Sequence, residues 1–186
     1  PGVSIKKVSI PLPQKDEVEK SLEPLKYKFT NDIRFISRNN WHITVSFLGW
    51  QGDESIYPIL KGMKETIKDF SRFKIEIDEI SYGPKNKPPR MIWLNCGKNT
   101  SKDLSALKDS LESKLMDEGL IFKQEHRQMK AHITLARFQA ADTNGLPDIK
   151  TNLNLNFEAE TMDLMESHLA RSGAKYEIMQ RFPFHN

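Results

Sequence analysis

The chain of 186 residues has a single cysteine, Cys96, so it can form no internal disulfide. The absence of a disulfide framework fits a reducing compartment, and a chain of this length buries enough apolar surface to fold without cross-links. The segment Ile92-Trp93-Leu94-Asn95-Cys96 is typical of a buried strand, so we expect a buried thiol. No run of about eighteen apolar residues and no secretion signal is present, which predicts a soluble, cytoplasmic protein without a membrane partner.

An excess of one charge is also lacking, because the net charge is only +3 and the isoelectric point about 8.9. This balance is too weakly basic for non-specific binding to duplex nucleic acid. The basic loop 85–90, stiffened by two prolines, ends at Arg90 and has two readings. It is a solvated turn, or it extends along a nucleic acid backbone, which would make Arg90 a substrate contact.

Histidine is scarce too, at five residues, and no pair of them has the His-x-His or His-x-x-x-His spacing of a metal site. No acidic pair with metal-ligand spacing accompanies them either. We therefore expect no metal and no cofactor, and nothing in the sequence indicates an obligate protein partner.

Two of the histidines stand in a repeated tripeptide, His42-Ile43-Thr44 and His132-Ile133-Thr134. Both copies have the composition of strands, and the period of two places His and Thr of each copy on one face. A lone strand histidine is more often a surface or core residue than a catalyst. The repetition favours two equivalent halves that line one groove with two imidazoles, each with a hydroxyl beside it. Histidine gives and takes protons near neutrality, so the pair suits acid and base catalysis.

Hydrophobic periodicity predicts the remaining elements. Strands are expected at residues 6–10, 33–37, 41–48, 73–77, 90–97, 129–137, 153–157 and 175–181, with further extended segments at 121–123 and 162–169. Helices are expected at 15–25, 54–70 and 101–116, and a loop or short irregular helix at 140–150. This mixture indicates an α+β fold of two pseudo-symmetric lobes, each a small antiparallel sheet with outer helices, flanking a central catalytic groove. We expect residues 1–186 to form one bilobal domain.

The motifs His-x-Thr-x-x-Phe-Leu-Gly at 42–49 and His-x-Thr-Leu-Ala-Arg at 132–137 resemble those of the two-histidine (2H) phosphoesterase superfamily. Within it, the chain is most similar to the RNA 2',3'-cyclic phosphodiesterase family, also called the 2'-5' RNA ligase family. The segments 88–94 and 172–177 resemble the strand before the family's middle helix and its closing hairpin.

The resemblance implies hydrolysis of terminal RNA 2',3'-cyclic phosphates to 2'-phosphates without a metal. In that hypothesis His132 is the base toward water and His42 the acid toward the 3'-oxygen, although the roles could be exchanged. Thr44 and Thr134 would donate hydrogen bonds to the phosphoryl oxygens. Arg137 would add a positive charge, unless it is only a surface residue at a strand end. The reverse reaction would join such an end to a 5'-hydroxyl without ATP.

Substrate contacts beyond the phosphate are expected from Phe47, Arg90 and Lys130. Phe47, Trp41, Tyr82 and Trp93 are candidates for stacking on a base, or else core residues. Strict alternation puts Phe47 on the face opposite His42 unless the strand bulges. Two alternatives stay open: a 2H phosphodiesterase acting on 2'-5' oligoadenylates or another cyclic phosphate, and a non-catalytic module that binds RNA ends.

Overall fold

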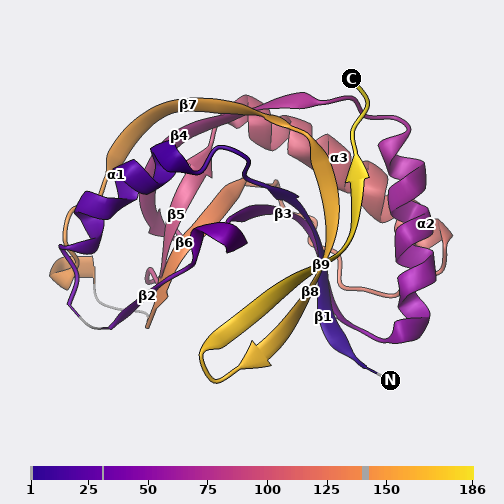
Figure 1. The fold of residues 1–186 in the computed structure, drawn as a ribbon, viewed down its shortest axis with the longest axis horizontal. Helices are drawn as coiled ribbons and strands as arrows, with labels where there is room; N and C mark the ends of the chain where they lie inside the picture. Colours follow the sequence, from indigo (N-terminus) through magenta and orange to yellow (C-terminus); the bar gives the residue numbers. More distant parts are fainter. Residues whose placement is uncertain (1, 31, 140–142) are drawn as a thin grey trace.

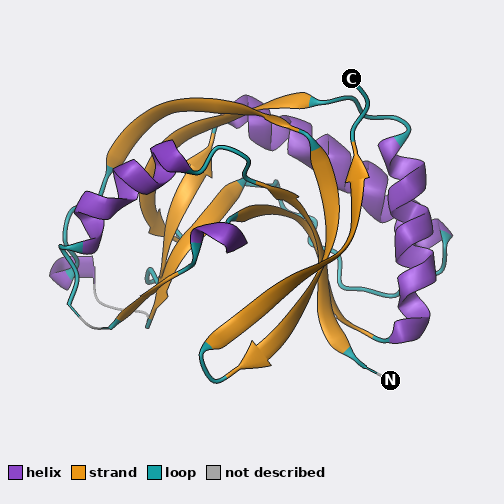
Figure 2. Ribbon diagram, in the orientation of Figure 1, coloured by secondary structure: helices purple, strands orange, loops and turns teal. Residues whose placement is uncertain are grey.

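The computed structural model describes residues 2–30, 32–139 and 143–186. Its strands are β1 (Ser4–Pro11), β2 (Ile33–Phe35), β3 (His42–Gln51), β4 (Phe73–Gly83), β5 (Met91–Cys96), β6 (His132–Phe138), β7 (Thr151–Ala159), β8 (Thr161–Ala170) and β9 (Gly173–Pro183). The α-helices are α1 (Asp16–Lys26), α2 (Ile56–Ile67) and α3 (Lys98–Asp117), and short 3₁₀ turns cover Arg38–Asn40, Asp53–Ser55 and Thr143–Gly145. Figure 2 shows the strands and helices coloured by type.

The strands form one strongly curved antiparallel sheet in the order β7-β4-β5-β6-β3-β1-β8-β9, with β2 paired to the free part of β6. The two halves of this order meet at β3 and β6, where a single pair, Ile43 opposite Ile133, joins them. Each half therefore contributes one His-x-Thr strand to the junction. The halves diverge from it, and the β8–β9 hairpin projects freely (Figure 1).

Helices α2 and α3 lie side by side (Figure 1) and approach closely, because a Cβ at Gly62 would lie 2.7 Å from Leu115 Cδ2. Helix α3 packs on β3 and β4 through a stripe of buried leucines with helical spacing, Leu104, Leu107, Leu111 and Leu115. Each such leucine contributes about 1.5–3 kcal/mol by leaving water. Helix α1 buries Val18, Leu22 and Leu25 in the same way.

The expected elements are found with shifted ends and one exception. The largest shift is in the strand expected at 73–77, which continues to Gly83 as β4. Residues 121–123 form no strand, and Ile121 is 89% exposed. Its carbonyl accepts a hydrogen bond from Gln51 Nε2, so a side chain takes the place of a strand partner. The helix expected at 54–70 begins only at Ile56, after a 3₁₀ turn. Part of the loop predicted at 140–150 lies outside the described residues.

The α+β class with antiparallel strands and packed helices is thus confirmed, as is the burial of Cys96, whose burial raises the pKa of its thiol to about 12. The two expected small sheets are continuous through the Ile43–Ile133 pair. No helix in the described ranges combines the length and the hydropathy needed to span a bilayer. The bilobal single domain over residues 1–186 and the cytoplasmic location stay predictions.

Candidate active site

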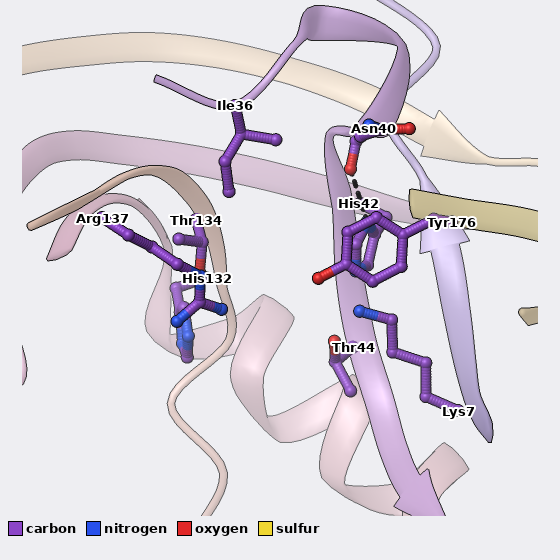
Figure 3. A pocket seen from close by; sticks show the side chains of 9 residues that line it. All are labelled: Lys7, Ile36, Asn40, His42, Thr44, His132, Thr134, Arg137 and Tyr176. Atoms are coloured by element: carbon purple, nitrogen blue, oxygen red, sulfur yellow. Dashed lines mark hydrogen bonds between the residues drawn. The ribbon is translucent and has the colours of Figure 1, made fainter. Parts of the chain in front are cut away.

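The two His-x-Thr strands face one small pocket of about 50 Å³ at the junction of the two halves of the sheet. His42 and Thr44 of β3 line one side, and His132 and Thr134 of β6 line the other (Figure 3). Between them in sequence, Ile43 and Ile133 point into the core and are at most 1% exposed. The alternation predicted from the motif is therefore present in both strands.

Both strands then break this alternation at the same place. The register of β3 against β1 skips Val45, and the register of β6 against β5 skips Leu135. Each extra residue and the one after it are buried, namely Val45, Ser46, Leu135 and Ala136. Such a β-bulge shifts every following side chain to the other face.

The bulges bring two further predicted residues to the groove. Arg137 lies five positions beyond His132, where strict alternation would turn it away, yet it lines the same pocket. Phe47 has the equivalent place in β3, is 57% exposed and lines the adjoining groove. The two halves of the sheet thus present equivalent sets, His42–Thr44–Phe47 and His132–Thr134–Arg137.

Both imidazoles are held by backbone carbonyls of the residue two positions earlier. His42 Nδ1 lies 2.6 Å from the Asn40 carbonyl oxygen, and His132 Nδ1 lies 2.8 Å from that of Lys130. A carbonyl oxygen can only accept a hydrogen bond, so in each ring Nδ1 carries the proton and Nε2 has a free lone pair. The repeated clamp therefore leaves two Nε2 atoms available for proton transfer.

The site is positively charged and partly dehydrated, and both features favour neutral imidazoles. Burial, then the charges of Lys7 and Arg137, lower the pKa of His42 to about 3 against the opposing clamp from Asn40. Burial first, and then Arg137, also lower the pKa of His132. Removing a cation from water and placing it beside other cations both disfavour the charged form. Before substrate binds, both rings are bases.

An aromatic ring packs against each of the two histidines. Trp93 of β5 stacks on His132 with ring centroids 3.9 Å apart and an angle of 22° between the planes. Tyr176 of β9 meets His42 edge to face at 5.2 Å. Trp93, a candidate for stacking on a base, therefore covers a histidine. Trp41 is 3% exposed, and the hydroxyl of Tyr82 donates to the Pro147 carbonyl, so both are structural here.

Four residues that line the pocket are not marked by any sequence motif: Lys7, Ile36, Asn40 and Tyr176. Lys7 comes from β1 and Tyr176 from β9, at opposite ends of the chain. The segment 172–177 was singled out as a hairpin, but no motif marked Tyr176 within it. Asn40 acts through its backbone carbonyl, which any residue type could supply.

A larger groove of about 550 Å³ opens from this pocket between β2 and the β8–β9 hairpin. Phe47 lines it, and so does Arg34, whose Nη1 donates to the Ser172 carbonyl across the groove at 3.3 Å. Arg90 and Lys130 line neither cavity, and both side chains are exposed. Lys130 contributes its carbonyl to His132 instead. The volume of the groove is in the range of small-molecule sites.

Within the described ranges, one group of three side chains is arranged as a metal could require, Glu166, His168 and Glu177. It lies on the β8–β9 hairpin and includes none of the residues of the small pocket.

An antiparallel α+β fold in which two His-x-Thr strands share one pocket defines a two-histidine phosphoesterase. The family model for the AKAP7 2'5' RNA ligase-like domain matches residues 8–181. The chain belongs to this family.

Relatives and solved structures agree with that assignment. The RNA 2',3'-cyclic phosphodiesterase of Methanocaldococcus jannaschii is 28% identical over 182 residues, which are 94% of this chain and 96% of the relative. That of Aeropyrum pernix is 27% identical over 156 residues, 79% and 84% of the two chains. The crystal structure of E. coli LigT complexed with 3'-AMP shares the fold, with a TM-score of 0.77 at 21% identity over 100% of both chains. The family resemblance and the expected phosphodiesterase class are confirmed.

Proposed function

We propose that this chain hydrolyses the 2',3'-cyclic phosphate at an RNA end to a 2'-phosphate. The observation that carries the proposal is the pair of imidazoles, each clamped through Nδ1 and each beside a threonine, on opposite sides of one cationic pocket. The relatives named as RNA 2',3'-cyclic phosphodiesterases support the same substrate.

The reaction needs two proton transfers on opposite sides of phosphorus. His132 Nε2 takes a proton from water as the water oxygen bonds to phosphorus. The bond from phosphorus to the 3'-oxygen breaks, and His42 gives that oxygen its proton. The 2'-ester remains, and the two histidines have exchanged protonation states. Each transfer is worth about 10² to 10⁴-fold in rate.

The charges around the rings support this order of roles. Lys7 lowers the pKa of His42 and is not among the causes for His132. Once protonated, His42 is therefore the stronger acid, which suits a poor leaving group, and His132 remains the stronger base. The phosphodiester supplies the negative charge that lets a proton reside on His42.

The remaining predicted residues would stabilise the charge on phosphorus. The hydroxyls of Thr44 and Thr134 would donate to the two non-bridging oxygens from the two sides of the pocket. Arg137, brought to the pocket by the β6 bulge, would add a fixed charge and a donor geometry that matches phosphate. Microscopic reversibility then gives ATP-independent joining of the cyclic end to a 5'-hydroxyl as the minor direction in water.

Phosphorus NMR of a ribonucleoside 2',3'-cyclic phosphate with the protein in EDTA tests the reaction and its regiochemistry together. We expect the 2'-phosphate, and its loss with His42→Ala and with His132→Ala. Turnover that survives both substitutions would refute the mechanism. An unchanged spectrum with wild-type protein would refute this substrate, and 2'-5' oligoadenylates would be the next ones assayed. Binding of cyclic ends without any turnover would identify a binding module.

A phosphodiester with a nitrophenolate leaving group tests the order of roles, because that group departs without a proton. On this substrate His42→Ala should recover most of its lost rate and His132→Ala should not. Recovery by His132→Ala alone would reverse the assignment.

A further inference from the structure

Lys7 is a buried cation at the wall of the pocket. Only 7% of this residue is exposed, and it lines both the small pocket and the larger groove. Its Nζ lies 3.9 Å from the centroid of the Tyr176 ring. In Figure 3 its ammonium lies on the same side as His42 and Thr44, across from Arg137.

The neighbouring buried lysine, Lys6, has the hydrogen-bond partners that Lys7 lacks. Lys6 is fully buried on the other face of β1, and its Nζ donates to Ser4 Oγ and to the Gln51 carbonyl, both at 2.9 Å. Ser4 Oγ in turn donates to the Glu166 carboxylate. Across residues 2–30, 32–139 and 143–186, Lys7 has neither a hydrogen-bond acceptor nor a carboxylate within ion-pair distance. Among the described residues, the face of the Tyr176 ring is what compensates its charge.

Arg137, across the pocket, is exposed where Lys7 is buried, but it too lacks a carboxylate partner among the described residues. In the described part of the chain its guanidinium contacts Met91 Sδ and forms no ion pair. Burying a charge without a partner is costly, so the buried ammonium of Lys7 indicates an absent anion. The exposed guanidinium of Arg137 faces the same cavity from the other side. One arginine would suffice for a single contact. Two cations on opposite sides indicate an anion held from both sides at once.

We propose that Lys7 is a fourth phosphate-binding group of this site, beside Thr44, Thr134 and Arg137. Its ammonium holds a non-bridging oxygen on the His42 side while Arg137 holds the phosphoryl group from the His132 side. For the identity of the substrate this rests on the proposed function; anion binding by Lys7 does not.

The charge of Lys7 makes anion binding depend on pH. The groups that face it are His42 on β3, Arg137 on β6 and Tyr176 on β9, with His132 beyond. Burial, and then Arg137, lower the pKa of Lys7 to about 7. Its ammonium is therefore complete below that pH and is lost above it. A bound anion favours the charged form, so affinity is highest below about pH 7 and declines as the pH rises.

Inorganic sulfate is the probe for this site, because it keeps its charge over the whole range. Its Kd is measured by NMR titration from about pH 6 to about pH 9. We expect wild-type affinity to fall by up to about tenfold for each pH unit above 7. Lys7→Met should bind about 10- to 100-fold more weakly at about pH 6, with no decline above 7. Lys7→Arg keeps its charge and should bind without the decline.

A second readout separates electrostatics from packing. Lys7 is among the causes that lower the pKa of His42, and not among those for His132. In Lys7→Met the imidazole protons of His42 should titrate at higher pH while those of His132 stay in place. Lys175→Met removes the same charge from the exposed neighbour of Tyr176 and should change neither titration nor sulfate affinity.

Wild-type sulfate affinity and pH dependence in Lys7→Met would overturn the proposal. If that variant does not fold, Lys7→Arg decides, because a decline identical to that of the wild type would also overturn it. Sulfate binding that depends on Lys7 in a protein without turnover would support this inference and refute the proposed function. Turnover of the cyclic phosphate, together with sulfate binding that does not depend on Lys7, would support the proposed function and refute this inference.

Discussion

Removal of the Arg137 charge should weaken phosphate binding and at the same time make His42 and His132 easier to protonate. Arg137 is among the causes that lower the pKa of His42, of His132 and of Lys7. It has no carboxylate partner among the described residues, so Arg137→Met leaves no buried carboxylate without its ion pair. The substitution keeps an unbranched, flexible apolar stem, although methionine is shorter than arginine. It removes the charge, the guanidinium donors and the contact with Met91 Sδ.

The size of the effect follows from the contact that is lost. A hydrogen bond to a charged group contributes about 1.5–3 kcal/mol, which is about 10- to 150-fold in kcat/KM for the cyclic phosphate. The pKa values of both histidines should rise, so the acid limb of the pH–rate profile should move to higher pH. NMR titration of the imidazole protons checks the first change, and steady-state kinetics across pH checks the second.

Stability in acid gives an independent check with a definite sign. The pKa of each histidine is lower in the folded than in the unfolded chain, so the unfolded chain binds more protons below about pH 6.5. Wild-type stability therefore falls as the pH is lowered through that value, and for His42 the fall continues toward about pH 3. Arg137→Met should lose less stability between about pH 7 and about pH 5.

Arg34→Met is the matched control, because Arg34 lies directly opposite Arg137 in the β2–β6 pair. It carries the same charge but is not among the causes of either histidine shift. A variant at Arg34 that raises both histidine pKa values as much as Arg137→Met would refute the reasoning. So would an Arg137→Met protein with unchanged titrations.

Three further outcomes are expected. Phe47→Ala should weaken binding of a dinucleotide by about 5- to 150-fold, because stacking of a base on the ring contributes about 1–3 kcal/mol. The melting temperature should not change, because Phe47 is 57% exposed. Equal affinity of variant and wild type would show that Phe47 does not contact the substrate. Cys96 should resist alkylation at about pH 8 until the protein is unfolded, since burial raises the pKa of its thiol to about 12. Rapid labelling of the native protein would contradict this prediction. Ser46→Ala removes the 2.8 Å hydrogen bond to buried Glu112, so it should lower the free energy of unfolding by about 1–3 kcal/mol, measured by urea denaturation. An unchanged free energy of unfolding would disprove this.

The sequence was sufficient for features that depend on local period. The leucine stripe of α3, the alternation in β3 and β6 and the repeated His-x-Thr pair follow from spacings of two and of three to four residues. The expected segment at 121–123 shows the limit of this reasoning, since a short apolar run becomes a strand only if another strand pairs with it.

The bulges could not be placed in advance, and they decide which residues reach the site. Counting from His42 and His132 by twos turns Phe47 and Arg137 away from the groove. The extra residues Val45 and Leu135 arise from pairing with β1 and β5, which are distant in sequence. Register is a property of two strands, so one strand's sequence does not fix it.

By itself, the sequence determined which reactive side chains face the pocket: two imidazoles and two hydroxyls in strands that present them on one face. The tertiary structure decided their surroundings: the carbonyl clamps that leave both Nε2 atoms free, the ring of Trp93 on His132, and the cation of Lys7 beside His42. Residue types and spacing are encoded locally. Burial, charge neighbours and pKa depend on segments that meet only when the chain folds.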